Sequence, residues 1–75
     1  MDPNELRKEA AAKLSRAKSI QAELDSPECD FTAEQRTKRE ARVDQLITEA
    51  SDEQAEAGKI VEAEAAAAKR RAAFA

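Results

Sequence analysis

The chain has no histidine, tryptophan or tyrosine, and it has one glycine and one cysteine among its 75 residues. Without histidine there is no imidazole base, no Ser/His/Asp or Cys/His nucleophile and no imidazole ligand for a metal. Gly58 alone cannot build a glycine-rich phosphate loop, and Cys29 alone cannot form an intramolecular disulfide or a cysteine-rich zinc site. The sequence therefore predicts a protein that is not an enzyme, with no catalytic residues, no metal site and no cofactor.

Large apolar side chains are scarce as well. Leu, Ile, Val and Phe together provide 11 residues, whereas alanine alone provides 18. In a chain of this length, such a composition excludes a thick globular core. Ala, Glu, Lys, Leu and Arg make up 46 residues, a balance that is typical of a long helix or a coiled coil.

No part of the sequence is expected to enter a membrane. Uncharged stretches such as Ala65 to Ala68 are far shorter than a bilayer requires. The N-terminal residues have no apolar core behind their charges, so they do not predict a secretion signal. A single thiol fits a reducing compartment, and we expect the protein in the cytoplasm.

Helix signals in the first third of the chain predict a helix that ends at a proline. Asp2 is a good N-cap, and Pro3 fits the first helical position, where no backbone donor is needed. Pro27 disfavours helical geometry in the residue before it and cannot donate within a continuing helix. We therefore expect a helix over about residues 3–25, followed by a loop over about residues 26–32.

A second helix start follows the loop. Thr32 and Gln35 are spaced as a capping box, in which each side chain bonds the backbone N–H of the other residue. Phe31 precedes the cap and is expected to fold over the end of the first helix. With no proline afterwards, a second helix is predicted over about residues 33–74, with Gly58 as the point where it can bend or fray.

Apolar residues recur at spacings of three and four in both segments, which places them on one stripe of each helix. A short connection between two such helices favours an antiparallel hairpin. The predicted fold is all-α: one antiparallel two-helix hairpin over residues 1–75, coiled-coil-like, with a longer second helix. The residues predicted to form the helix–helix or self-association interface are Leu6, Leu14, Ile20, Leu24, Phe31, Val43, Leu46, Ile47, Ile60 and Val61.

A hairpin that is symmetric about the loop pairs residue i with about residue 57 − i. This register sets Leu14 near Val43 and Lys13 near Asp44, so that apolar side chains meet and a base meets an acid. The first helix would then cover the second only as far as about residue 54. We expect self-association with other copies through the uncovered part.

Charges are segregated along the second helix. Seven acids lie between Asp44 and Glu64 with Lys59 as the only base, and the basic run Lys69 to Arg71 follows. One interpretation is head-to-tail matching with other copies, and the other is a solvated face with cations near a helix C-terminus. Nucleic-acid binding is not expected, because the net charge is −3 and no aromatic stacking platform is present. Binding of the second helix to a membrane surface is not expected either, because its apolar stripe is rich in alanine.

The pattern of residues resembles the N-terminal scaffolding segment, or delta domain, of tailed-phage major capsid proteins. That family has an "LR" helix of alanines and basic residues, a polar break ending "L-T-x-E-E", and a helix with "L-x-x-E-I". Here Phe31 replaces the Leu of the break, Gln35 replaces its second Glu, and Leu46 to Glu49 departs from the last element. The resemblance covers about residues 5–60, and its stretches are Glu5 to Leu14, Asp30 to Gln35 and Val43 to Leu46.

The resemblance implies a role in capsid assembly. Such segments are fused to the capsid subunit, project into the procapsid, help subunits to assemble and are then removed by a phage maturation protease. It implies that the capsid-forming fold follows this segment, that other capsid subunits and the protease are its partners, and that it acts in the host bacterial cytoplasm, inside the procapsid. Two other interpretations stay open: a stand-alone cytoplasmic coiled-coil adaptor or separate small scaffolding protein, and a nucleic-acid or chaperone-type binder.

Overall fold

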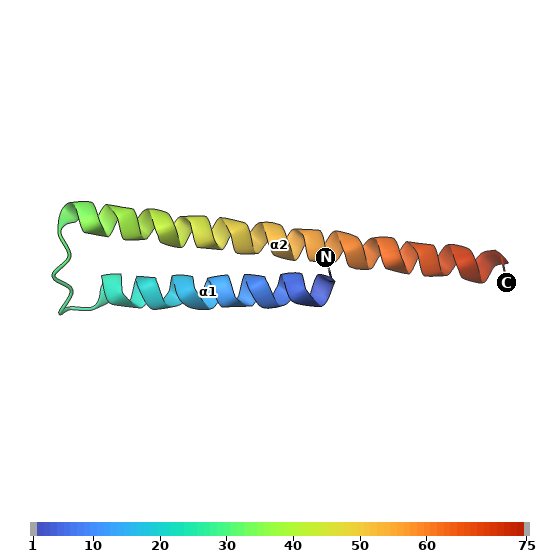
Figure 1. Cartoon of the computed structure of the whole chain (residues 1–75), viewed down its shortest axis with the longest axis horizontal. Coiled ribbons are helices and arrows are strands. Elements are labelled where there is room, and N and C mark those ends of the chain that lie inside the picture. Colours follow the sequence, from blue (N-terminus) through green and yellow to red (C-terminus); the bar gives the residue numbers. More distant parts are fainter. Residues whose placement is uncertain (1, 75) are drawn as a thin grey trace.

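The computed structural model describes residues 2–74, which form two α-helices packed side by side (Figure 1). Helix α1 spans Pro3–Asp25 and helix α2 spans Ala33–Phe74. The helices run antiparallel and form a rod of 65 × 16 × 15 Å, with the loop at one end and the C-terminal part of α2 at the other. The predicted all-α hairpin with a longer second helix is confirmed.

Both ends of α1 follow from their local sequence. The Asp2 side chain accepts a hydrogen bond of 2.9 Å from the Asn4 N–H, and Pro3 occupies the start of the helix. At the other end Ser26 adopts extended backbone, and its N–H donates to the Glu23 carbonyl at 3.3 Å. The helix stops there because Pro27 has no N–H to continue it.

The start of α2 is a reciprocal capping box. The Thr32 hydroxyl accepts from the Gln35 N–H at 3.1 Å, and the Gln35 side chain accepts from the Thr32 N–H at 3.0 Å. Two backbone donors at the helix start, which no helical carbonyl can reach, are satisfied in this way.

Thr32→Ala is expected to lower the free energy of unfolding by about 1 kcal/mol, because it removes the acceptor for the Gln35 N–H. Thermal unfolding followed by circular dichroism measures the change. Thr37→Ala is the matched control: Thr37 is exposed inside α2, its hydroxyl bonds only the Ala33 carbonyl, and alanine is the better helix former. Equal stability of the two variants would contradict a capping role for Thr32.

The seam between the helices follows a heptad-like alternation of three and four residues. Every seam position is buried or half-buried, in the order Leu6, Ala10, Lys13, Ala17, Ile20, Leu24 on α1 and Val43, Leu46, Ala50, Glu53, Ala57, Ile60 on α2. Alanines at many of these positions bring the backbones close but bury little area. The hairpin is therefore a thin coiled coil rather than a globular core.

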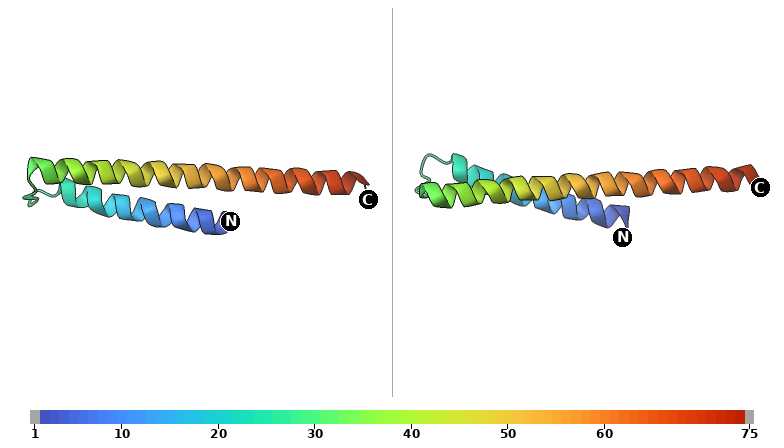
Figure 2. Two further views of the ribbon diagram at one scale, coloured as in Figure 1. Left: turned by 45° about the horizontal axis from the view of Figure 1, so that its top comes forward. Right: turned by 90° about the horizontal axis from the view of Figure 1, so that it is seen from above.

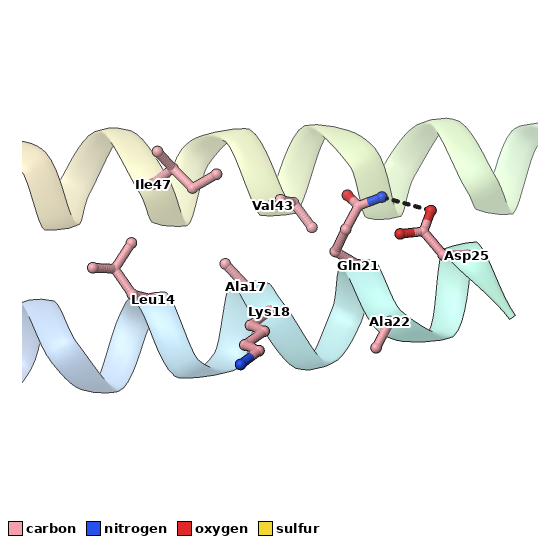
Figure 3. A pocket seen from close by; sticks show the side chains of 8 residues that line it. All are labelled: Leu14, Ala17, Lys18, Gln21, Ala22, Asp25, Val43 and Ile47. Carbon is pink, nitrogen blue, oxygen red and sulfur yellow. Dashed lines mark hydrogen bonds between the residues drawn. The ribbon is translucent and has the colours of Figure 1, made fainter.

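The predicted register is wrong by at least one helical turn. Lys13 does not lie near Asp44; its ammonium is 3.8 Å from the Glu49 carboxylate and also contacts Glu53. In the close view of the seam, Leu14 lies opposite Ile47 instead of Val43 (Figure 3). Residues of α1 thus face positions further along α2 than a symmetric hairpin allows.

The loop explains the shift. Its first part is a tight turn, in which the Cys29 N–H donates to the Ser26 carbonyl at 3.1 Å, but the chain then runs on irregularly to Thr32. Helix α2 consequently begins beyond the end of α1 (Figures 1 and 2). Cover by α1 also extends further than residue 54, since Ala57 is fully buried and Ile60 is half-buried.

Helix α2 continues through Gly58 as one helix, and its ribbon shows no kink there (Figure 2). The backbone of Gly58 has no positive φ, and a Cβ built on it would meet no atom within 4 Å. The glycine therefore serves neither a turn nor a close contact within the described chain, and it lowers the local stability of the helix.

Gly58→Ala is accordingly expected to raise the free energy of unfolding by about 1 kcal/mol. The reverse change at an exposed position of the same helix, Ala55→Gly, should lower it by a similar amount. Urea unfolding monitored by helical circular dichroism compares the two variants. A loss of stability in Gly58→Ala would mean that α2 needs a bend at this point.

Candidate association surface

The loop end of the hairpin is closed by an aromatic ring and two arginines. Phe31 packs against the core, and the Arg39 guanidinium lies 3.9 Å from the centre of its ring. Arg36 donates to the Leu24 carbonyl at 3.2 Å and lies 3.8 Å from the Cys29 sulfur. Arg36 thus satisfies a carbonyl at the end of α1 that has no helical partner and joins the two helices, whereas Arg39 connects α2 to the loop residue Phe31.

Six of the predicted interface residues are used inside the hairpin. Leu24, Val43 and Leu46 form a buried cluster with Ala17, against which Ile20 and Phe31 pack. The residues that are buried are Leu6, Leu24, Val43 and Leu46, and those that are half-buried are Ile20 and Phe31. These side chains hold the two helices together and are largely covered within the hairpin.

Three of the other four predicted residues remain accessible. Leu14 is 38% exposed, Ile47 46% and Val61 40%, while Ile60 is half-buried. Leu14 and Ile47 face each other across a shallow groove between α1 and α2 (Figure 3). The remaining groove residues are Ala17, Lys18, Gln21, Ala22, Asp25 and Val43, and Gln21 donates to Asp25 at 3.0 Å on its rim. An apolar strip with a polar margin therefore lies along the hairpin.

One ion pair lies in the seam itself. Lys13 and Glu53 occupy seam positions on opposite helices, and their side chains are 32% and 13% exposed. They contact each other directly, and one Glu53 oxygen, Oε2, is buried without a hydrogen-bond partner among the described residues. Polar residues at seam positions fix register and orientation at a cost in stability. Neither residue was among the predicted interface residues, although the three-and-four spacing includes both.

Beyond α1 the last part of α2 extends alone (Figures 1 and 2). We call residues 61–74 the overhang. All of its residues are exposed except Ala67, which is half-buried. Phe74 at its end is 87% exposed; it was not predicted as an interface residue, although it continues the seam spacing from Ile60 through residues 64, 67 and 71.

The overhang carries opposite charges at its two ends. Glu62 and Glu64 lie next to the hairpin, and Lys69, Arg70 and Arg71 lie near the C-terminal end of the helix. The alanines from Ala65 to Ala68 separate the two groups and leave a smooth, narrow helix surface. Such a surface can pair with a second helix at short distance if the charges match.

A metal-binding cluster and a membrane-spanning helix are both absent from residues 2–74. No group of three or more His, Cys, Asp or Glu side chains in this range is placed to hold a metal ion. None of the helices described is long and apolar enough to cross a membrane. Comparison of the chain with protein-family models, with curated proteins and with solved structures finds no match.

Proposed function

We propose that this chain is a capsid assembly scaffold: a helical segment fused to the N-terminal side of a phage major capsid protein, which directs procapsid assembly from inside the shell. The observation that carries the proposal is the overhang. Beyond the paired helices, α2 presents an uncovered stretch with an exposed phenylalanine, Phe74, and segregated charges, which is a surface suited to binding another helix. The resemblance of residues 5–60 to delta domains is the reason for proposing that this binding takes place in a phage procapsid.

The packing of the hairpin suits a temporary role. The seam and the overhang are rich in alanine, and alanine contacts supply few deeply buried anchors. Association through such surfaces is weak for a single copy and gains strength when many copies lie side by side on one shell. In the proposal the segment acts in the host cytoplasm within the procapsid, is removed by the maturation protease and performs no catalysis, nucleic-acid binding or membrane binding.

Deletion of residues 3–74 from the parent capsid gene tests this proposal. We expect the deletion to abolish or strongly reduce closed shells of uniform size, with the subunit left as free capsomers or irregular aggregates. Electron microscopy and sedimentation of lysates measure the yield and size of the shells. Shells of normal size in normal yield would contradict a scaffolding function.

A second candidate is a stand-alone coiled-coil adaptor or a separate small scaffolding protein, and the same overhang favours it. The reading frame after the codon for Ala75 distinguishes the two. A frame that continues into a capsid-forming domain supports the fused scaffold, whereas a stop codon supports the separate protein.

A further inference from the structure

Helix α2 has a seam face that α1 covers for only part of its length. Ala57 is fully buried against α1 and Ile60 is half-buried. Of the seam positions that follow, Ala67 is half-buried, and Glu64, Arg71 and Phe74 are exposed. The same alternation of three and four residues continues through them without a break. The overhang therefore continues the seam for about 20 Å, and α1 does not cover this part.

We propose that a second copy of this chain covers this seam, with the two overhangs antiparallel about a two-fold axis near Ala67 and Ala68. Pairing residue i with residue 135 − i sets Glu64 of each copy beside Arg71 of the other. It also brings Val61, which flanks the seam position Ile60 and is 40% exposed, to the level of the Phe74 ring, which is 87% exposed. Both contacts occur twice, as two-fold symmetry requires.

Each copy leaves residues 61–74 uncovered, so the same residues of two overhangs can cover each other. Along the seam, the overhang of the partner occupies the line that α1 would follow if it were longer (Figure 1). The end of the partner helix then reaches the start of α1, where Ile60 is half-buried and Val61 is exposed. The pair forms a rod two helices thick that continues the hairpin of each copy.

Charge selects this orientation over the parallel one. A parallel pair would place Glu64 against Glu64 and Arg71 against Arg71, and like charges at facing positions repel. The antiparallel pair replaces both repulsions by attractions. The hairpin already contains an attractive charge pair of this kind within one chain, since Lys13 and Glu53 meet in the seam between the antiparallel helices α1 and α2.

Sedimentation equilibrium of the whole chain over a wide concentration range tests the pairing. We expect a monomer–dimer equilibrium that Glu64→Arg and Arg71→Glu each weaken about tenfold, since each variant turns two attractions into two repulsions. The double exchange Glu64→Arg/Arg71→Glu should restore the dimer. Glu62→Arg and Arg70→Glu are matched controls with the same charge changes off the seam spacing, and they should leave dimerisation largely unchanged.

Cross-linking tests the orientation. In a Cys29→Ser background, Val61→Cys and Phe74→Cys chains should be joined by a short bis-maleimide when they are mixed, and neither should cross-link with itself. A chain that stays monomeric up to about 1 mM overturns the pairing. So does a dimer that Glu64→Arg leaves intact, or one in which the Val61→Cys chain cross-links with itself.

The pairing rests on the proposed function, because it names the partner of the overhang. Different results would refute the pairing and the scaffolding function. A monomeric chain whose deletion still stops shell formation refutes the pairing alone. A chain that pairs as described, but whose deletion leaves normal shells, refutes the scaffolding function alone.

Discussion

Leu46→Ala is expected to lower the free energy of unfolding by about 3 kcal/mol and to leave the hairpin largely unfolded at micromolar concentration. Leu46 is 2% exposed and is the largest fully buried side chain in residues 2–74. It belongs to the buried cluster of Ala17, Leu24 and Val43, so its truncation to alanine leaves a cavity in that cluster. A hairpin with so few large apolar residues has a low free energy of unfolding, so a loss of this size leaves it largely unfolded.

The neighbouring residue provides the control. Ile47 is 46% exposed on the groove side, so Ile47→Ala removes a comparable side chain that is only partly covered. It should cost less than about 1 kcal/mol. Urea unfolding by circular dichroism gives both values under the same conditions. Similar losses in the two variants would mean that the seam does not run through Leu46 as described.

Lys13→Met is expected to lower the free energy of unfolding by about 2 kcal/mol. Methionine keeps most of the apolar stem of the lysine, so the change removes mainly the charge. The Glu53 carboxylate, 13% exposed in the seam, would then be without its close cation. Its Oε2 atom has no hydrogen-bond partner in the described part of the chain even in the wild type, so little remains to solvate the charge.

A double-mutant cycle separates the ion pair from packing. Lys13→Met/Glu53→Met should regain the stability of the wild type or exceed it, because an apolar pair replaces two partly desolvated charges. Lys8→Met is the control for loss of a positive charge on α1, since Lys8 is exposed and makes no ion pair with residues 2–74. If Lys13→Met proved as stable as Lys8→Met, the Glu53 carboxylate would not depend on Lys13 for its stabilisation.

The sequence predicted the features that depend on neighbouring residues. The Asp2 cap, the stop at Pro27 and the Thr32–Gln35 box each act within a few positions, and each is present in the structure. The seam could be predicted in part, because apolar residues at spacings of three and four identify it. The ion pair of Lys13 and Glu53 was missed, since charged residues on a helix are usually assigned to its solvent face.

The register could not be predicted, because it depends on the path of the loop. The irregular chain from Cys29 to Thr32 and the bond from Arg36 to the Leu24 carbonyl together let α2 begin beyond the end of α1. A symmetric hairpin ignores this displacement. The error had little effect on the choice of buried residues, since the spacing of apolar residues, and not the register, identifies the stripe that faces inward. It did affect which residues meet and how much of α2 is left uncovered.

We propose that the folded hairpin, and not merely the presence of its residues, directs shell assembly. The most direct measurement is the yield of closed shells from capsid subunits that carry Leu46→Asp, a charge placed in the buried seam. Subunits with Ala41→Asp, the same charge on an exposed position of α2, serve as the control. The claim predicts normal shells with Ala41→Asp and a loss of closed shells with Leu46→Asp. Normal shells from a Leu46→Asp subunit whose segment is unfolded by circular dichroism would contradict it.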